Sequence, residues 1–413
     1  MKAAKRIALS AVAILLAGCA GNQPLVPVQS SHPSDQYVDA HFHISNYVYQ
    51  GVSLKTLIDR YMGDKIIRSV VMPLPLQQEW DRYEHYEHDM IPPNYYLGPK
   101  AELYYYAFAD AMIAKEYGLL SAADKARLDP MITGFNPMDR YATQHIKRVL
   151  LTFPGVFSGI GEFTIHKEIV SNKIAGDPIQ AISLDPIPPD VARGGKLSLY
   201  SPALTGIFDL AGETGLVATL HNDIYETDVK YDGTVLKKSP SKTYAAAIKY
   251  ACTKSPNAKV IWAHTGLGRF VQPTSDHLAI VSDILDTCPN WSVDISWDLV
   301  QKVIVAPEAG MPSLADWARF ITKYQDRVLW GSDTVIYSKN KIDDKGNGVR
   351  GSPMSVEEYR AVADITKPLW DVLGPDISRK VKVTNEVRLF DAAKVKVRVW
   401  EAAHTNDDVW NLE

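Results

Sequence analysis

The sequence has little of several features that would each define a class of protein. It has three cysteines in 413 residues, which excludes a disulfide-rich scaffold. It has no excess of positive charge, since 44 Lys and Arg face 48 Asp and Glu, and this argues against a general nucleic-acid binder. It also lacks internal repeats, low-complexity tracts and a glycine-rich phosphate motif after a strand. What is present, 46% hydrophobic residues, suffices for a large core and indicates a large globular protein of the enzyme type.

The N-terminus predicts an export signal. Three basic residues precede an apolar run over residues 7–17, which is too short to span a bilayer. The following Leu16-Ala17-Gly18-Cys19 resembles the lipobox of bacterial lipoproteins, which implies removal of residues 1–18 and lipidation of Cys19. The alternative is a secreted protein with an incidental cysteine. Residues 19–36 are polar, contain proline and predict a tether.

The lipobox resemblance implies a location in the bacterial cell envelope. Ala20, in place of Asp, favours a lipid anchor in the outer membrane, facing the periplasm, over the inner membrane. In that oxidising compartment Cys252 and Cys288 are candidates for a disulfide, because each lies just before a predicted strand at the end of a helix. The sequence leaves open whether they pair.

Eight short apolar or β-branched runs recur along the rest of the chain. They cover residues 37–41, 69–73, 131–135, 156–162, 216–221, 259–264, 291–296 and 328–333. Most are continuously apolar, as expected of parallel strands that are buried on both faces, and helical patterns lie between them. We therefore predict an α/β fold, a (β/α)₈ TIM barrel over residues 37–400 with a tail at 401–413. A doubly wound open sheet is the alternative.

Two intervals between predicted strands are longer than the others. Residues 77–125 are rich in Tyr and His, and residues 164–201 contain the pair Gly194-Gly195 and several Pro. Both follow a strand, so we expect both insertions at the C-terminal face of the barrel, where barrel active sites are built. They could be lids or substrate walls; the alternatives are surface elaborations or the interface of a homo-oligomer. Residues 339–351 predict a flexible loop at the same face.

Metal-binding side chains end five of the eight predicted strands. His41 and His43 are two residues apart in the first strand, so their imidazoles project from the same face. The later strands end with one such residue each, namely Glu162, His221, His264 and Asp333. Because the ends of parallel barrel strands meet at one rim, we expect these side chains to converge. Asp39 is a candidate to support the two histidines from the same face.

This ordered set resembles the amidohydrolase superfamily, and within it the amidohydrolase-related (amidohydrolase 2) branch. Supporting motifs are Trp262-Ala-His264-Thr-Gly266, Val293-Asp294-Ile295-Ser296 and Asn385-Glu-Val-Arg-Leu-Phe390. The resemblance implies that His41, His43, His221 and Asp333 hold a catalytic divalent metal, with His264 as a further ligand or a group that polarises the substrate. Glu162 would bridge to a second ion; alternatively it orients a histidine or contacts the substrate.

The resemblance further implies a metal-dependent hydrolase. A metal-activated water would attack a small ester, lactone, amide or phosphoester, with Asp333 as the general base and His264 or the metal polarising the scissile group. Nitrogen-rich ligation favours Zn²⁺, as one or two ions. His166 and Arg269 are candidate substrate contacts. The alternatives are a metal-dependent non-oxidative decarboxylase or hydratase of a carboxylic acid, and a catalytically silent envelope binding protein.

Overall fold

A computed structural model of the chain describes residues 35–44, 51–74, 76–78, 103–105, 107–167, 198–229, 235–268, 271–336, 340–342, 348–350 and 354–412. The predicted signal, Cys19 and nearly all of the predicted tether lie outside these residues. The described residues belong to a single compact unit.

The central sheet is a parallel barrel. Its strands are β1 (Tyr37–His43), β2 (Ile66–Met72), β5 (Leu128–Ile132), β6 (Gly159–Thr164), β7 (Val217–His221), β10 (Lys259–Trp262), β11 (Trp291–Asp294), β12 (Val328–Leu329) and β13 (Thr334–Val335). They follow the order β12-β11-β10-β7-β6-β5-β2-β1-β13, and every neighbouring pair is parallel. Only four residues separate β12 from β13, so the two are halves of one eighth strand that pairs with β11 and with β1. This closes the sheet, and the predicted (β/α)₈ barrel is confirmed.

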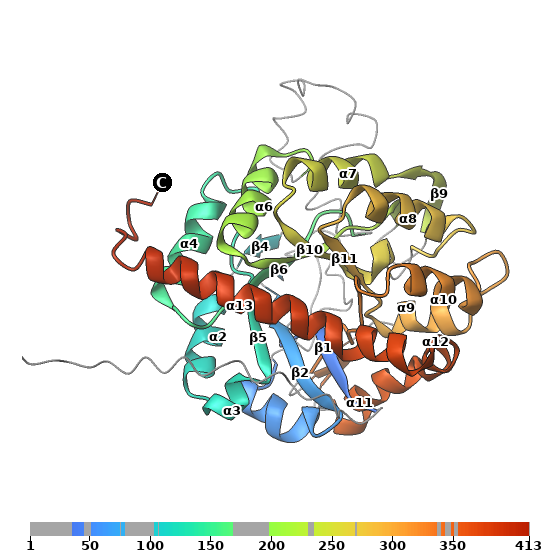
Figure 1. The fold of residues 1–413 in the computed structure, drawn as a ribbon, viewed down its shortest axis with the longest axis horizontal. Helices are drawn as coiled ribbons and strands as arrows, with labels where there is room; N and C mark the ends of the chain where they lie inside the picture. The colour runs from blue at the N-terminus through green and yellow to red at the C-terminus, as the bar shows by residue number, and fades with distance from the viewer. Residues whose placement is uncertain are drawn as a thin grey trace, which may run out of the picture. The chain divides into compact units, whose positions relative to one another are not determined.

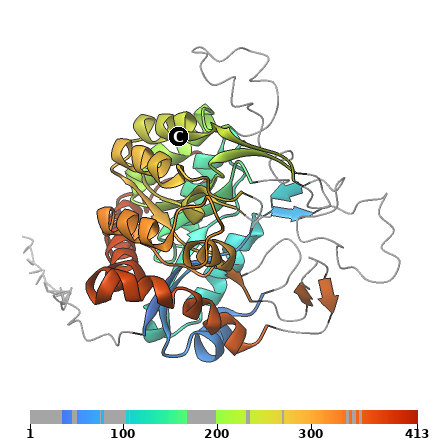
Figure 2. The same ribbon diagram turned by 90° about the vertical axis from the view of Figure 1, so that its right-hand side faces the viewer.

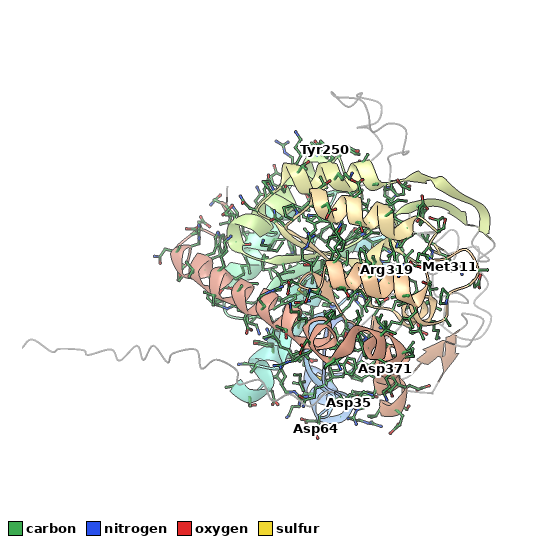
Figure 3. All side chains as sticks on the ribbon, turned by 45° about the vertical axis from the view of Figure 1, so that its right-hand side comes forward. Asp35, Asp64, Tyr250, Met311, Arg319 and Asp371 are labelled. Carbon is green, nitrogen blue, oxygen red and sulfur yellow. A yellow bond between two sulfur atoms is a disulfide. The ribbon has the colours of Figure 1, made fainter. Side chains whose placement is uncertain are left out.

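Helices follow the strands and surround the barrel. They are α1 (Leu54–Thr56) with η1 (Leu57–Met62), α2 (Phe108–Gly118), α3 (Ala122–Lys125), α4 (Ala142–Thr152), α6 (Pro202–Thr214), α7 (Ala245–Lys254), η3 (Ala263–Gly266), α8 (His277–Thr287), α9 (Asp298–Val305), α10 (Leu314–Lys323), α11 (Val356–Ile365), α12 (Lys367–Arg379), η4 (Lys380–Thr384) and α13 (Asn385–Ala403). Exposed side chains such as Arg319 of α10 and Asp371 of α12 lie on the outside of this shell (Figure 3). None of these described helices is both long and apolar enough to cross a bilayer.

Serine residues begin several of these helices. Ser313 accepts a hydrogen bond from the backbone N–H of Asp316, whose carboxylate accepts one from the backbone N–H of Ser313. Ser355 and Glu358 form the same reciprocal pair at the start of α11. Such capping boxes satisfy backbone N–H groups that have no partner within the helix, and so they fix where α10 and α11 begin.

Three antiparallel pairs extend from the loops of the barrel. They are β3 (Leu76–Gln78) with β4 (Leu103–Tyr105), β8 (Tyr225–Val229) with β9 (Val235–Thr243), and β14 (Asn340–Ile342) with β15 (Gly348–Arg350). Figure 2 shows all three pairs on one side of the barrel, away from α13. The first pair belongs to the predicted insertion at residues 77–125, and the third occupies the stretch predicted as a flexible loop. The β8–β9 pair was not predicted, because its Lys- and Asp-containing strands carry no apolar run.

One apolar cluster fills the inside of the barrel, and a larger one lies outside it. The inner cluster comprises Ala40, Val70, Met72, Met131, Val217, Ile261 and Leu329 from the strands, with Phe390 and Ala393 from α13. Figure 1 shows α13 running across the end of the barrel at which β1, β2 and β5 begin. The motif that ends in Phe390 therefore closes the bottom of the barrel. The opposite end, where the strands finish, is left for the polar groups of the candidate site.

Most strands depart from their predicted bounds by a few residues, and two of the differences have a clear physical reason. β5 begins at Leu128, earlier than the predicted residue 131, because Asp129 is fully buried against Arg68 and Lys394 and so is compatible with a strand interior. The predicted strand at 328–333 is interrupted after Leu329. Asp333 there has a positive φ of 49°, a conformation that a regular strand does not allow.

Candidate metal centre

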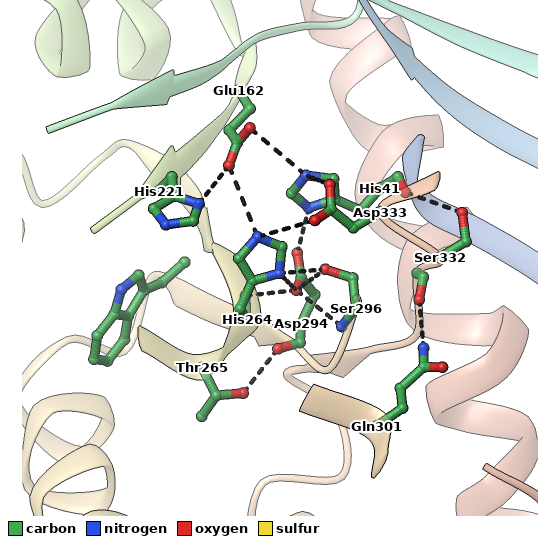
Figure 4. A network of polar contacts seen from close by, with 12 residues as sticks. His41, Glu162, His221, His264, Thr265, Asp294, Ser296, Gln301, Ser332 and Asp333 are labelled. Carbon is green, nitrogen blue, oxygen red and sulfur yellow. Dashed lines mark hydrogen bonds and ion pairs between the residues drawn. The ribbon is translucent and has the colours of Figure 1, made fainter. Parts of the chain in front are cut away.

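Six side chains from five strand ends converge at the C-terminal mouth of the barrel. Figure 4 shows His41, Glu162, His221, His264 and Asp333 of this set. His41 and His43 come from β1, Glu162 from β6, His221 from β7, His264 from the turn after β10, and Asp333 from the break in the eighth strand. All six were predicted to lie together, and the structure brings them together. Five of their side chains are at most 3% exposed, whereas that of Asp333 is 11% exposed.

One half of the centre is built on β1 and the eighth strand. The Nε2 atoms of His41 and His43 lie 3.2 Å apart. Asp333 Oδ1 is 3.4 Å from His41 Nε2 and 3.1 Å from His43 Nε2. These three ligand atoms can hold one cation.

The other half is built on β7 and β10, and Glu162 joins the two halves. Its Oε1 atom is 2.8 Å from His221 Nδ1 and 3.9 Å from His264 Nε2. Its Oε2 atom is 3.3 Å from His43 Nε2 and 3.9 Å from His41 Nε2. Each oxygen of this carboxylate therefore faces a different pair of imidazoles, which is the arrangement that a carboxylate bridging two cations requires.

Each imidazole uses its other nitrogen to contact a protein partner. His41 Nδ1 lies 3.0 Å from Asp294 Oδ2, and His43 Nδ1 lies 3.3 Å from the carbonyl oxygen of Met72. His221 Nε2 lies 3.1 Å from Asp223 Oδ1, and His264 Nδ1 lies 2.8 Å from Ser296 Oγ. Such contacts fix the orientation of a ligating imidazole and leave the lone pair of the other nitrogen directed at the centre.

The electrostatics of the centre favour ionised carboxylates. Burial raises the pKa of Asp333, but the neighbouring imidazoles of His264, His41 and His43 outweigh it and hold this pKa well below its usual range. Burial also raises the pKa of Asp294, and the charge of His41 reverses this. Burial lowers the pKa of His264 to about 3, so that this imidazole is neutral and its lone pair is available.

Two buried atoms of the centre indicate that a cation fits there. Glu162 Oε2 and His264 Nε2 are inaccessible and have no hydrogen-bond partner among the described residues. A buried polar atom without a partner costs about 1–3 kcal/mol, and more when the group is charged. A divalent cation with nitrogen and oxygen ligands would satisfy both atoms, and the donor set suits Zn²⁺ and similar ions.

Unusual backbone geometry positions three residues at this rim. Non-glycine residues with positive φ are uncommon, yet His264 (55°), Asp333 (49°) and Trp297 (74°) all have it beside the centre. Gly331 allows a further close approach, because a Cβ atom there would lie 2.7 Å from His41 Cβ. The eighth strand can thus approach β1 closely enough to place Asp333 against His41 and His43.

The remaining predicted site residues have different positions. His166 is buried with its ring stacked on Tyr244, at a centroid distance of 3.7 Å, and its carbonyl oxygen accepts the backbone N–H of Asp223. Asp39 does not contact the imidazoles; its carboxylate accepts hydrogen bonds from Ser332 and Tyr359. A shift of the β1–β2 register between Asp39 and Phe42 separates its side chain from the inward face. Arg269 and Cys19 lie outside the described residues.

A disulfide joins Cys252 at the end of α7 to Cys288 just after α8, with the two Cα atoms 5.7 Å apart. The sequence placed these cysteines at the ends of neighbouring helices and left their pairing open. In the structure the two helices pack side by side, which brings the thiols together.

Several residues that support the centre carry no predicted role. Asp294 and Ser296 are named from the sequence only as members of a motif, and Asp223 and Lys167 are not singled out there. A signal for three of them exists: Ser296 follows Asp294, the last residue of β11, by two residues, and Asp223 follows His221, the last residue of β7, by two residues. The same spacing that pairs His41 with His43 therefore applies to them.

The fold and the site together define a closed (β/α)₈ barrel with a histidine–carboxylate cluster at its C-terminal mouth, able to bind a divalent metal.

No protein-family profile matches the chain, and no curated protein matches it. Solved structures similar to it include an amidohydrolase from Burkholderia multivorans, with 10% identity, 86% of this chain and 99% of that chain covered and a TM-score of 0.43. Amidohydrolase 2 from Bifidobacterium longum subsp. infantis has 15% identity, 86% and 98% coverage and a TM-score of 0.42. Dihydroorotase from Saccharomyces cerevisiae has 12% identity, 88% and 86% coverage and a TM-score of 0.44.

Proposed function

We propose that the protein is a metal-dependent hydrolase of the amidohydrolase type, acting on a small ester, lactone, amide or phosphoester. The observation that carries this proposal is the position of Glu162, whose two oxygens face two separate pairs of imidazoles. A site for two cations favours hydrolysis over decarboxylation, because a second ion chiefly serves to activate and position water.

The metal ligands would be His41, His43, Glu162, His221, His264 and Asp333, with Zn²⁺ as the first candidate. A bound divalent metal supplies a Lewis acid, which lowers the pKa of a water molecule and polarises the scissile group. The chain's own residues supply the geometry and the proton transfer. Contacts to Asp294, Met72, Asp223 and Ser296 hold the imidazoles in place, so that no reorganisation is needed when the substrate binds.

Asp333 is the proposed general base. It is ionised, and its side chain is the most exposed of the six, so it can exchange a proton with water and substrate at the mouth. Its Oδ2 atom lies 3.6 Å from His264 Nε2, which places the proton acceptor beside the group proposed to polarise the substrate. Asp333 would take the proton from the attacking water and return it to the leaving group.

The test of this proposal combines metal analysis with turnover. The purified protein is expected to contain a divalent metal and to hydrolyse at least one member of a panel of esters, lactones, amides and phosphoesters. Asp333→Asn should lower kcat by about 10²–10⁴-fold, the usual contribution of a general base, while metal remains bound. Full turnover by this variant with its metal retained would contradict the assignment.

Glu162→Gln tests the second cation. We expect the metal content per chain, measured by inductively coupled plasma mass spectrometry, to fall in this variant together with turnover. A wild type with one tightly bound ion, and a Glu162→Gln variant with unchanged metal and unchanged rate, would instead favour the decarboxylase or hydratase alternative.

We also propose that the enzyme works in the bacterial cell envelope, as a protein lipid-anchored through Cys19. The Cys252–Cys288 disulfide supports an oxidising compartment. Mass spectrometry of the protein from membranes tests the anchor: a triacylated Cys19 at the mature N-terminus is expected, and an unprocessed Met1 would contradict it.

A further inference from the structure

Exposed apolar side chains gather on one side of the barrel. Eight large apolar side chains are exposed among the described residues, and only Val372 of α12 lies apart from the others. Monomeric soluble proteins rarely gather exposed apolar side chains in one region, so this side is a candidate contact surface. The other seven belong to α2 (Phe108, Met112 and Leu119), the residue before α4 (Tyr141), α13 (Val395 and Val399) and the segment after it (Trp410).

The elements that carry these side chains are neighbours. His145 Nε2 of α4 lies 3.7 Å from Asp110 Oδ2 of α2, which brings the two helices together. Arg148 of α4 donates to the carbonyl oxygen of Val409 at 2.8 Å, which holds the segment of Trp410 against α4. Figure 1 shows α2, α4 and the C-terminal end of α13 at one side of the barrel, with α10 at the opposite side.

The composition of this side favours a lipid surface over a second protein. Met112, Lys115 and Leu119 are exposed and follow one face of α2, at spacings of three and four residues. Lysine is depleted where proteins contact one another, whereas surfaces that lie on membranes combine lysine with apolar and aromatic side chains. The long side chain of Lys115 can keep its ammonium group at the phospholipid headgroups. Tyrosine and tryptophan, here Tyr141 and Trp410, are the residues enriched at that depth.

The proposed anchor brings such a surface within reach. Asp35, the first described residue, follows Cys19 by sixteen positions. A flexible chain of that length has a root-mean-square span of about 20–24 Å and a maximum of about 55 Å. Such a short tether gives the barrel an effective concentration at the bilayer of the order of millimolar. A weak contact is therefore enough to decide which side of the barrel faces the lipid.

We propose that the side formed by α2, the start of α4 and the C-terminal end of α13 docks on the phospholipid surface to which Cys19 anchors the protein. This inference rests on the proposed lipid anchor and is independent of the reaction at the metal centre. Because the docking surface is a side of the barrel and not an end, the barrel axis would lie along the bilayer. The mouth would then open at the membrane surface, and the α10 side would face water.

A fluorescent label at a single engineered thiol tests this orientation. Cys252 and Cys288 are paired and Cys19 would carry lipid, so a new cysteine is the one reactive thiol of the mature protein. Protein purified from membranes as Leu119→Cys is labelled with nitrobenzoxadiazole and placed in vesicles of phosphatidylcholine and phosphatidylethanolamine. Arg319→Cys is the control, since this side chain of α10 is 72% exposed at the opposite side.

The label at position 119 should emit at shorter wavelength and be quenched by doxyl-labelled phosphatidylcholine severalfold more than the label at position 319. Apolar faces docked on a bilayer enter it by about 5–10 Å, which is within reach of the doxyl group. Adding Met112→Asp should reduce the quenching at position 119, whereas adding Val372→Asp should not. Met112 and Val372 are matched in exposure, at 50% and 55%. Circular dichroism checks that each variant is folded.

Equal quenching at positions 119 and 319 would overturn the proposal, because the anchored barrel would then have no preferred side. A shift to shorter wavelength at position 119 without quenching by the doxyl lipid would also overturn it, since a second copy of the chain would then cover α2. Protein without acyl chains that does not join the vesicles would refute the anchor and this proposal together. Turnover of the same sample decides the hydrolase proposal separately.

Discussion

At the scale of single residues, the centre depends on side chains that hold its imidazoles in position. Asp294 is the clearest case, because it is fully buried and makes several contacts at once. Its Oδ2 atom lies 3.0 Å from His41 Nδ1, and its Oδ1 atom accepts the backbone N–H of His264 at 2.7 Å and the hydroxyl of Ser296 at 2.6 Å. One carboxylate thereby fixes two of the imidazoles.

Asp294→Asn should therefore weaken metal binding about 10- to 100-fold without unfolding the barrel. An amide offers one acceptor oxygen, so it cannot accept from His41 on one side and from His264 and Ser296 on the other. Metal affinity, measured by competition with a chelating dye, checks this expectation. Asp298→Asn changes an exposed carboxylate of α9 and is the control; equal affinities in the two variants would show that Asp294 does not position the ligands.

At the scale of elements, a second charged cluster holds β2, β5 and α13 together at the opposite end of the barrel. Arg68 donates to both carboxylate oxygens of Asp129, and Lys394 lies 2.8 Å from the same carboxylate. Glu386 of α13 is buried beside them; burial and the neighbouring Asp129 raise its pKa well above the usual range. The cluster ties the closing helix to β5 and to β2, whose other end supplies the carbonyl oxygen of Met72 that contacts His43.

Asp129 gives this cluster a defined pH dependence. Burial raises its pKa, but Arg68 and Lys394 outweigh burial and lower it to about 2. Because the unfolded chain has a pKa near 4, the ionised carboxylate stabilises the fold above about pH 4, and this contribution of about 2–3 kcal/mol is lost as the pH falls towards 2. Asp129→Asn should be less stable than wild type at pH 7, and the difference should narrow between pH 4 and pH 2.

Urea unfolding at a series of pH values measures that difference. Asp391→Asn is the control, since Asp391 contacts the same Arg68 but is 56% exposed, and exposed ion pairs contribute little. A constant difference between wild type and Asp129→Asn from pH 7 to pH 2 would mean that the carboxylate's charge does not stabilise the fold.

At the scale of the whole molecule, closure of the barrel brings together residues that are hundreds of positions apart. The backbone N–H of Asp333 donates to the carbonyl oxygen of His41 at 2.7 Å, and Ser332 donates to the carboxylate of Asp39 at 2.6 Å. On the outside, the disulfide links α7 and α8 across a sequence separation of 36 residues. Both kinds of contact restrain the chain over long distances.

The disulfide should contribute to global stability and not to the centre. Cross-linking a loop of this length is expected to stabilise the fold by about 3–4 kcal/mol through the lost entropy of the unfolded chain. The double variant Cys252→Ala, Cys288→Ala should show a lower free energy of unfolding in urea, and wild type with reductant should match it. Metal content should be the same in all three samples; equal stability of the oxidised wild type and the double variant would contradict the expectation.

Much of the fold follows from local patterns. The eight strands could be placed because parallel barrel strands are buried on both faces and therefore leave continuous apolar runs. The convergence of His41 and His43 follows from the two-residue period of a strand, and the approach of Glu162, His221, His264 and Asp333 follows from the common rim at which parallel strands end. These features depend on covalent geometry and on burial, which the sequence carries at each position.

The other features depend on which surfaces meet, and the tertiary structure alone decided them. The pairing of Asp294 with His41 and of Cys252 with Cys288 depends on distances between strands or helices that no local pattern contains. The positive φ of Asp333 and His264 is tolerated only because the closed barrel holds these residues in place. The sequence thus determined the strands and the residues at their ends, whereas barrel closure decided which atoms face the centre, since hydrogen bonds across the barrel form only after its first and eighth strands meet.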